Sequence, residues 1–453
     1  MAMVNEETIC ALATPPGTGG LGVIRVSGPE AFAIVDRVSR RPKQASCAVF
    51  KSHTLHRASI VDADGVVIDD VLLSIFHNPR SYTGEDVVEI SAHGSPLIIG
   101  RIMARLLQSG ARTARPGEFT QRAFLNGKMD LTQAEAVGDL IAAQTEQAQR
   151  QAQRQSEGRL SKAVLKIRVG ILGVLAQIEA SIDFPEEVGE LNISDCETEL
   201  GKSQCQIADL LATADQGILY REGLQVVLAG RPNVGKSSLL NALLRTNRAI
   251  VTSVPGTTRD VIEETLNLHG IPLRVSDTAG LRETENEVEV IGVARTRESI
   301  AGADIVLLVL DSVSGETPED LTLRQTLLGR PHLTVWNKWD LQAETEPPSH
   351  GTPVSALTGW NLDALETAIT QLALGDAADG TESALVTHAR HKQALQSAAS
   401  QITDAAHSLQ SGLPADFASI DLRGALDALG QITGETATED IIAEIFSRFC
   451  IGK

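Results

Sequence analysis

The sequence feature that most constrains this chain is GRPNVGKSS, which occupies residues 230–238. An apolar run, LQVVLA, ends just before it, and SLLNALL begins at its last residue. A strand, a Gly-rich turn and a helix in this order form the setting of a phosphate-binding P-loop with the pattern G-x-x-x-x-G-K-S. The glycines let successive N–H groups turn toward an anion, Lys236 can reach the terminal phosphates, and the Ser237 hydroxyl can bind Mg²⁺. The motif therefore predicts a nucleotide-binding α/β domain.

Length and composition limit the class of protein. With 453 residues, the chain should form two to four domains. No apolar run approaches the roughly 20 residues of a membrane span, and the start MAMVNEETICALATPP lacks a signal-peptide pattern. We therefore expect a cytoplasmic protein whose five cysteines are thiols. A net charge of −19 argues against a protein that coats nucleic acid through a generally basic surface.

The N-terminal part, residues 1–127, is predicted to be an α/β domain. Strand-like runs cover residues 21–28, 66–76 and 84–94, and a helix with start and stop signals covers 95–110. Residues 14–22 are rich in Gly and Pro, which indicates a loop. Two interpretations of this loop stay open: a turn that binds no ligand, or a turn that contacts one.

Two stretches flanking the P-loop domain are rich in helix-forming residues. In the first, residues 128–221, apolar residues recur every three or four positions, as in a helical bundle: Leu160, Val164, Ile167, Ile171, Val174, Ile178 and Ile182. In the second, residues 375–453, helices are expected over about 384–410, 417–430 and 438–449. Neither stretch has an obvious partner of its own, so we expect the two to pack together as one discontinuous helical domain.

Residues 222–374 alternate strands and helices, which predicts a parallel sheet with ligands at the carboxyl ends of its strands. Three further motifs follow the P-loop in this region. DTAG (277–280) can hold Mg²⁺ through Asp277 and a γ-phosphate through the Gly280 N–H. NKWD (337–340) has the form of a guanine-recognition motif, in which the carboxylate of Asp340 pairs with guanine and rejects adenine. SAL (355–357) lies where a second base contact would. Together these motifs predict a Ras-like GTPase domain.

The catalytic groups are less defined by the residues alone. VPGTTRD (254–260) can supply a threonine that closes over Mg²⁺ and the γ-phosphate, with Thr258 preferred and Thr257 its competitor. Leu281 stands where Ras-like proteins carry a glutamine that positions water, so catalysis needs another group. The candidates are the carboxylates Glu283, Glu285, Glu287 and Glu289, or a residue of a partner protein. An arginine finger could come from Arg282 or Arg259, although a surface or switch-loop charge is the simpler interpretation of both.

The whole chain resembles the MnmE (TrmE) family of tRNA-modification GTPases. The resemblance rests on ATPPGTGGLGVIRVSG near the start, TGEDVVEI, RPGEFTQRAFLNGKMDLTQAEA and the final C-x-G-K. It implies an N-terminal domain, residues 1–127, that binds 5-formyl- or methylene-tetrahydrofolate and forms a homodimer. It also implies an FAD-containing partner, MnmG (GidA), in a heterotetramer that modifies carbon 5 of the wobble uridine of certain tRNAs. The added group would be of the aminomethyl or carboxymethylaminomethyl type.

The resemblance also implies roles for individual residues. Hydrolysis would depend on K⁺ held by Asn233 and by the loop with Thr252, Val254 and Thr257, and Glu289 would orient the water. Cys450 matches the cysteine of the terminal motif, with a catalytic or a structural role. The folate ligands would be Arg25, Glu89, Lys128 and Lys453. The complete nucleotide and cation set is Asn233, Val234, Gly235, Lys236, Ser237, Ser238, Thr252, Ser253, Val254, Pro255, Gly256, Thr257, Thr258, Asp277, Thr278, Ala279, Gly280, Asn337, Lys338, Asp340, Ser355, Ala356 and Leu357, with Ser237, Thr258, Asn233, Thr252, Val254 and Thr257 as metal ligands.

Two other functions remain open at this point. One is a regulatory GTP switch that binds an effector, although no strongly basic RNA-binding domain accompanies the GTPase motifs. The other is a folate-binding scaffold in which GTP hydrolysis only controls assembly. An arginine- and lysine-rich stretch over residues 150–168 could meet RNA phosphates, but a solvated helix face is the simpler interpretation.

Overall fold

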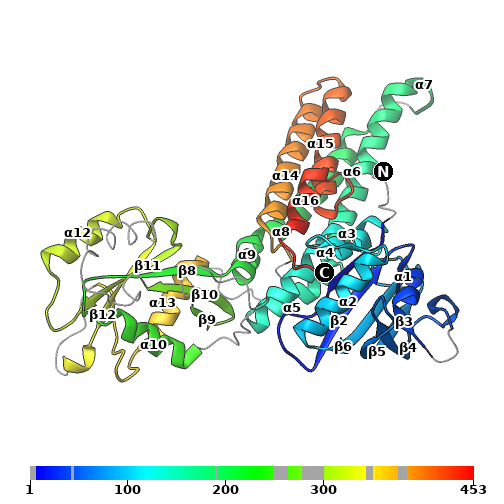
Figure 1. The fold of residues 1–453 in the computed structure, drawn as a ribbon. Coiled ribbons are helices and arrows are strands. Elements are labelled where there is room, and N and C mark those ends of the chain that lie inside the picture. Colours follow the sequence, from blue (N-terminus) through cyan, green and yellow to red (C-terminus); the bar gives the residue numbers. More distant parts are fainter. Residues whose placement is uncertain are drawn as a thin grey trace. The chain divides into compact units, whose positions relative to one another are not determined.

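The structure is a computed structural model that describes residues 7–41, 45–188, 191–247, 264–277, 300–342, 350–375 and 385–453. The chain divides into two compact units. Unit 1 contains residues 1–138 and 429–453, and unit 2 contains residues 139–428. Both combine a sheet with helices (Figure 1).

Unit 1 is built on a seven-stranded sheet with the order β3-β4-β5-β6-β2-β1-β7. All neighbouring strands are antiparallel except β1 and β7, which are parallel. The strands are β1 (Ile9–Leu12), β2 (Leu21–Ser27), β3 (Ser39–Arg40), β4 (Thr54–Val61), β5 (Val67–Phe76), β6 (Val87–His93) and β7 (Arg112–Thr113).

Two helices of unit 1 pack on the sheet because their apolar faces complete its core. Ile34 and Val35 of one helix and Ile102 and Leu106 of another join the inward residues of the strands in one buried cluster. The helices are α1 (Ala31–Val38), η2 (Cys47–Val49), α2 (Pro96–Gln108), α3 (Glu118–Leu125) and α16 (Glu439–Ser447). Helix α4 (Leu131–Ala142) begins in unit 1 and ends in unit 2.

The sheet of unit 2 has the order β13-β12-β11-β8-β10-β9. Its strands are β8 (Leu224–Ala229), β9 (Glu264–Leu268), β10 (Ile271–Asp277), β11 (Ile305–Asp311), β12 (His332–Asn337) and β13 (Thr352–Pro353). Helices α10 (Lys236–Asn247), α12 (Pro318–Thr326), η3 (Trp339–Leu341) and α13 (Leu362–Leu374) accompany it. β11 is buried along nearly its whole length, as expected for a strand covered on both faces.

The remaining helices of unit 2 form a bundle. They are α5 (Glu146–Ser156), α6 (Arg159–Asp183), α7 (Pro185–Val188), α8 (Ile193–Ala212), α9 (Ala214–Glu222), α14 (Ala389–Gln410) and most of α15 (Ala415–Thr433). α8 contacts both α6 and α14, although α14 follows the sheet in sequence and α6 and α8 precede it (Figure 1). Gln204 donates a hydrogen bond to Thr403 across 3.0 Å, and Arg423 pairs with Glu179 at 2.7 Å.

Three expectations need correction. The sheet of unit 2 is not wholly parallel, because the unpredicted edge strand β9 runs antiparallel to β10. Ile182 does not continue the buried stripe of α6, because its side chain lies near the helix end and is 40% exposed. The helix expected from residue 384 begins at Ala389, since His388 has an extended backbone with φ −120° and ψ 136°.

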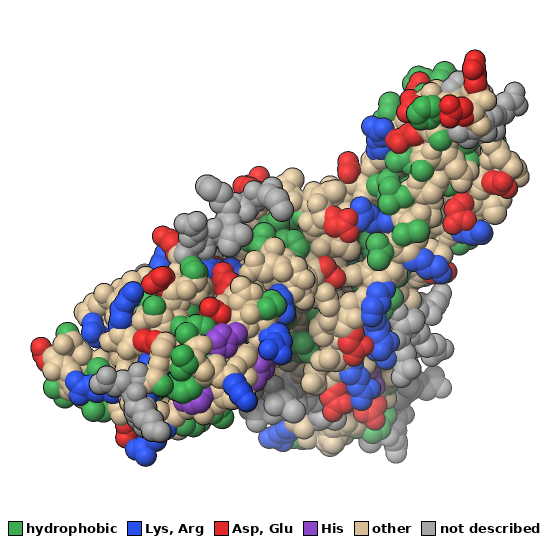
Figure 2. All heavy atoms as spheres, turned by 90° about the vertical axis from the view of Figure 1, so that its right-hand side faces the viewer, with side chains coloured by type: hydrophobic (Ala, Val, Ile, Leu, Met, Phe, Trp, Pro, Cys, Tyr) green, Lys and Arg blue, Asp and Glu red, His purple; other side chains and the backbone are tan. Residues whose placement is uncertain are grey.

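The surface carries both signs of charge. On the face that Figure 2 presents, Lys and Arg side chains are interspersed with Asp and Glu side chains. Within residues 150–168, Arg150 pairs with Glu146 at 3.5 Å and Arg159 with Glu157 at 3.0 Å. Local acidic neighbours therefore offset part of the positive charge of this stretch.

Candidate functional site

The P-loop joins β8 to α10 and has the backbone that its glycines allow. Gly230 has φ 149° and Gly235 has φ 93°. A Cβ on Gly230 would lie 2.3 Å from the Val309 carbonyl oxygen, so no other residue fits there. Asn233, between them, also has a left-handed backbone, with φ 64°. The loop thus curls into a concave turn at the N-terminus of α10, where an anion is stabilised.

Lys236 lies inside this turn. Its side chain is 6% exposed, and its Nζ donates to the carbonyl oxygens of Gly230 at 2.9 Å and Arg231 at 2.8 Å. A phosphate in the turn would give the ammonium group a charged acceptor, which makes a stronger hydrogen bond than a carbonyl does. The predicted phosphate-binding role of Lys236 therefore fits the geometry.

The end of β12 holds the P-loop from the side. Asn337 is buried, and its Nδ2 donates to the Val234 carbonyl oxygen at 2.9 Å, while its Oδ1 accepts from the Ala356 N–H at 3.0 Å. The Asn337 side chain thus connects the P-loop to the SAL segment. It also explains why residue 235 is glycine, because a Cβ at that position would lie 2.2 Å from Asn337 Nδ2.

Lys338 makes a second connection. Its Nζ donates to the Asn233 carbonyl oxygen at 2.8 Å and forms an ion pair with Asp311 at 2.7 Å. Burial raises the pKa of the Asp311 carboxyl, but the hydrogen bond and charge of Lys338, with backbone N–H donors, lower it overall. Asp311 therefore stays ionised and fixes the lysine that holds the P-loop.

A cavity of about 590 Å³ opens beside the P-loop, toward the loop after β13. Ser355 Oγ donates to Asp340 Oδ1 at 2.6 Å, which orients the carboxylate predicted to bind guanine. The cavity is lined by Gly235, Ser238, Asn241, Ala242, Arg245, Asn337, Lys338, Asp340, Leu341, Ala356, Leu357, Thr358, Gly359 and Leu362. Among the polar residues that line it, sequence reasoning missed Asn241, Arg245 and Thr358.

Several predicted residues lie outside the described part of the chain. Asp277 is the last residue of β10, and β10 lies beside β8. Its motif was expected at the end of a strand, as observed, but the side chain of Asp277 is not described. The predicted residues outside the description are Thr252, Ser253, Val254, Pro255, Gly256, Thr257, Thr258, Thr278, Ala279, Gly280 and Glu289.

Sequence reasoning also missed two groups that support the P-loop. Asp311 ends β11, and its place at a strand end was the available signal. Arg231 pairs with Asp320 at 2.9 Å, and Asp320 is fully buried at the start of α12. Thr317 and Asp320 form a capping box, whose T-x-x-D spacing could have been read from the sequence.

A second cluster of predicted residues lies in unit 1. Arg25 on β2 and Glu89 on β6 are directly paired in register, and Arg25 Nη2 lies 2.8 Å from Glu89 Oε1. The guanidinium lies 5.2 Å from the centre of the Tyr82 ring and 5.5 Å from that of Phe119. Arg25 also donates to the Gly452 carbonyl oxygen at 3.4 Å. The structure therefore brings the two strand residues and the C-terminal tail together.

The tail is held by backbone contacts. The Gly117 N–H donates to the Cys450 carbonyl oxygen at 3.4 Å, and the Phe119 N–H donates to a Lys453 oxygen at 3.2 Å. Gly452 has φ 97°, and a Cβ there would lie 2.3 Å from the Leu12 carbonyl oxygen. The glycine of the terminal C-x-G-K is thus required by close packing, while the side chain of Cys450 is exposed.

Lys128 reaches a loop that also contributes to this cluster. Its Nζ donates to the Pro79 carbonyl oxygen at 3.0 Å, and Tyr82 of the same loop contacts Arg25. The side chain of Lys128 is exposed. Its described hydrogen bond goes to the Pro79 carbonyl oxygen, and the contacts that the structure describes include none between Lys128 and Arg25 or Glu89.

The P-loop, the NKWD segment predicted to recognise guanine and the loop after β13 meet at one edge of a mostly parallel sheet. This arrangement is that of a P-loop GTPase. The family model of the GTP-binding protein TrmE N-terminus matches residues 8–128, and that of the MnmE helical domain matches residues 131–450. The tRNA modification GTPase MnmE of Moorella thermoacetica is 46% identical, over 99% of this chain and 100% of its own length. Its counterpart from Roseiflexus castenholzii is 44% identical over the full length of both chains.

The chain belongs to the MnmE family of tRNA modification GTPases, which confirms the resemblance read from its motifs. It is a GTP hydrolase, and membership implies binding of GTP and Mg²⁺. The solved FeoB G-domain from Methanococcus jannaschii is 26% identical over 33% of this chain and 97% of that chain, with a TM-score of 0.26. Among the helices that the structure describes, none combines the length and apolar character that crossing a membrane requires.

Proposed function

We propose that this chain is a K⁺-dependent GTPase that acts with a flavoprotein partner of the MnmG (GidA) type. Together they would modify carbon 5 of the wobble uridine of certain tRNAs, using the one-carbon unit of a tetrahydrofolate. We also propose that it works as a homodimer in the cytoplasm, and that its GTPase region (222–374) is inserted in a helical domain made of residues 128–221 and 375–453. The packing of α8 against both α6 and α14 supports the insertion.

The K⁺ proposal rests mainly on the backbone conformation and exposed side chain of Asn233. Lys338 holds its carbonyl oxygen at 2.8 Å, its backbone has φ 64°, and its side chain is exposed at the P-loop. Within the described residues its carboxamide has no hydrogen-bond partner, so its oxygen is free to bind a cation beside the phosphates. Bound there, K⁺ would supply positive charge to the transition state, as an arginine finger does in other GTPases. Thr252, Val254 and Thr257 would complete its coordination.

Mg²⁺ and the water would be held by the remaining motifs. Ser237, in the first turn of α10, would bind Mg²⁺ directly, Asp277 would bind it through water, and Thr258 would close over it when GTP is present. With Leu281 in place of a polar residue, we assign the orientation of the attacking water to Glu289. Hydrolysis would then require the segment after DTAG to adopt a GTP-bound arrangement.

For the folate we propose the cluster in unit 1. The carboxylate of Glu89 suits the amidine-like edge of a pterin, and the cations of Arg25, Lys128 and Lys453 suit its acidic tail. Because Arg25 already pairs with Glu89 at 2.8 Å, a pterin would share or replace that contact. The exposed thiol of Cys450 lies on the same tail, where it would serve the modification chemistry or hold the tail in place.

The first experiment compares steady-state GTP hydrolysis in KCl and NaCl at equal ionic strength, so that screening is the same in both. We expect a large stimulation specific to K⁺ that is lost in Asn233→Ala, while that variant still binds GDP. Equal rates in the two salts would contradict the cation site.

A second experiment tests whether hydrolysis is coupled to modification. Glu289→Ala should bind GTP, fail to hydrolyse it, and fail to support modification in a reconstituted assay with the flavoprotein partner. Full modification by this variant would instead favour the folate-binding scaffold, in which hydrolysis only controls assembly.

A further inference from the structure

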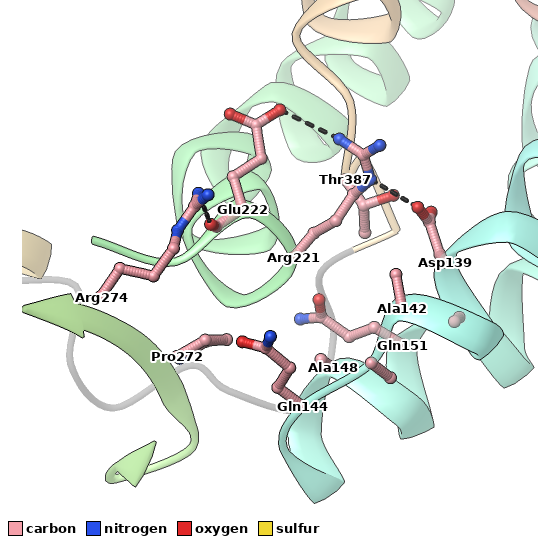
Figure 3. A pocket seen from close by; sticks show the side chains of 12 residues that line it. Asp139, Ala142, Gln144, Ala148, Gln151, Arg221, Glu222, Pro272, Arg274 and Thr387 are labelled. Atoms are coloured by element: carbon pink, nitrogen blue, oxygen red, sulfur yellow. Dashed lines mark hydrogen bonds and ion pairs between the residues drawn. The ribbon is translucent and has the colours of Figure 1, made fainter. Parts of the chain in front are cut away.

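Unit 2 contains a second pocket, of about 320 Å³, that shares no lining residue with the nucleotide cavity. It lies where β10 and the end of α9 meet the α4–α5 connection and residue 387 (Figure 3). Its lining residues are Asp139, Ala142, Ala143, Gln144, Ala148, Gln151, Ala152, Arg221, Glu222, Pro272, Arg274 and Thr387.

Gln151 is the group in this pocket that needs an explanation. Its residue is only 4% exposed, and neither its Oε1 nor its Nε2 has a hydrogen-bond partner in the described structure. Buried polar side chains nearly always have partners, so an unpaired carboxamide marks a place where a partner is absent. Figure 3 shows that Gln151 and Gln144 both direct their amides into the space between α5 and β10. A carboxamide offers a donor and an acceptor side by side.

The charges around the pocket favour an anion near β10. Arg221 is already engaged, since it lies 2.7 Å from Asp139 and 3.0 Å from Glu222. Arg274 Nη2 donates at 2.6 Å to a backbone carbonyl oxygen, that of Glu222, and in the described structure the guanidinium has no carboxylate partner. Its other N–H groups remain available to an acidic ligand, for which a guanidinium is the preferred partner.

The carboxylate of Asp139 does not cancel this positive charge. Its Oδ1 accepts from Arg221, and its Oδ2 lies 2.9 Å from His388 Nε2. Burial raises the pKa of the Asp139 carboxyl, but the hydrogen bond and charge of His388 and the charge of Arg221 outweigh burial and lower this pKa. The carboxyl group therefore stays ionised. Its charge is thus offset mainly by the Arg221 guanidinium, which it shares with Glu222.

We propose that this pocket binds a small planar anion that carries an amide or imide edge together with a carboxylate or phosphate. The edge would pair with Gln151, the anionic group would meet Arg274, and the short side chains of Ala148, Ala152 and Pro272 would leave room for a flat ring. Orotate has this chemistry, and uridine 5′-monophosphate carries the same imide edge on a planar base, with its phosphate on the ribose. The proposal is independent of the function proposed above, and the bound ligand would join β10 of the sheet to α5 of the helical bundle.

Isothermal titration calorimetry on the full chain tests the proposal. The nucleotide site is first saturated with GDP and Mg²⁺, so that a probe cannot bind at the P-loop. Orotate and uridine 5′-monophosphate are then titrated separately, with inorganic phosphate and uracil as probes that carry only one of the two features. We expect at least one of the first two to bind with a Kd below about 1 mM, and phosphate and uracil to bind at least about tenfold more weakly.

Variants locate the site. Gln151→Leu keeps the side-chain volume and removes the amide, and Arg274→Ala removes an exposed cation; each should weaken binding by about tenfold or more. Gln149→Leu, on the exposed face of the same helix, is the matched control and should bind as the unaltered chain does. Circular dichroism checks that each variant folds. If Gln151→Leu misfolds, Arg274→Ala still tests the pocket, because Arg274 is exposed. Absence of binding by both orotate and uridine 5′-monophosphate, or equal binding by Arg274→Ala and the unaltered chain, would overturn the proposal.

Discussion

Replacing Glu118 by glutamine should weaken the part of unit 1 that holds the C-terminal tail. Glu118 is 1% exposed, and its carboxylate accepts hydrogen bonds from Arg112 at 2.7 and 3.0 Å and from Arg122 at 3.2 Å. It also accepts from the Arg115 N–H at 2.8 Å at the start of α3. The next residue, Phe119, donates to the tail and lies under the Arg25 guanidinium. Loss of the carboxylate should therefore loosen α3 and the tail together.

The pKa of Glu118 gives the magnitude of this effect. Burial raises the pKa, but the arginines and the backbone N–H outweigh burial and lower it from 4.5 to about 2. A carboxyl whose pKa is lowered in the folded state stabilises that state above its unfolded pKa, and the contribution is lost as the pH falls from 4.5 toward 2. The shift corresponds to about 3 kcal/mol at pH 7 and about 1 kcal/mol at pH 3, if glutamine imitates the neutral acid.

Hydrogen exchange read by mass spectrometry measures this locally, which suits a chain of several domains that need not unfold in one step. Peptides covering α3 in Glu118→Gln should exchange roughly 300-fold faster than in the unaltered chain at pH 7, and roughly tenfold faster at pH 3. Comparing the two chains at one pH cancels the intrinsic exchange rate. Glu7→Gln, which removes an exposed carboxylate from the same Arg112, should change exchange by less than about fivefold. A ratio for Glu118→Gln that is the same at pH 7 and pH 3 would refute the reasoning.

Three further predictions concern unit 2. Asp340→Asn should lower GTP affinity by at least about a hundredfold and raise xanthosine triphosphate affinity, measured by competition with a fluorescent nucleotide, because the carboxylate is the expected partner of the guanine donors; unchanged selectivity would contradict this role. Gly235→Ala should abolish nucleotide binding in the same assay, since its Cβ would lie 2.2 Å from Asn337 Nδ2; normal affinity would show that the loop can shift. Thr145→Val should make peptides covering α5 exchange hydrogen about 5- to 30-fold faster, which corresponds to about 1–2 kcal/mol, because Thr145 caps α5 and donates to the Gly270 carbonyl oxygen at 2.8 Å; unchanged exchange in α5 would argue against the cap.

Much of the nucleotide site could be predicted because each motif is local. A P-loop needs its glycines at fixed spacing, and Gly230 and Gly235 have the positive φ values that the pattern requires. The apolar run LQVVLA predicted β8 with its observed bounds. The edge strand β9 was missed because ETLNL alternates only weakly, and a short edge strand need not be apolar on both faces.

The remaining features depend on contacts between segments far apart in sequence. Nothing local to Gly452 indicates that it packs against Leu12, and nothing local to Gln151 indicates that its amide is buried without a partner. Arg25 and Glu89 were selected by family resemblance, and only the antiparallel register of β2 and β6 places them opposite each other. Register follows from the whole sheet, so it could not be read from either strand alone.

The geometry also decides how substitutions in the guanine-recognition motif can be interpreted. Asn337 and Lys338 both hold P-loop carbonyl oxygens, those of Val234 at 2.9 Å and Asn233 at 2.8 Å. Changing either residue would disturb phosphate binding and base recognition at once, so the loss of GTP affinity could not be assigned to the base. Asp340 contacts Ser355 and makes no described contact with the P-loop. Within this motif, Asp340 is therefore the position at which recognition of the base can be measured separately from the shape of the phosphate site.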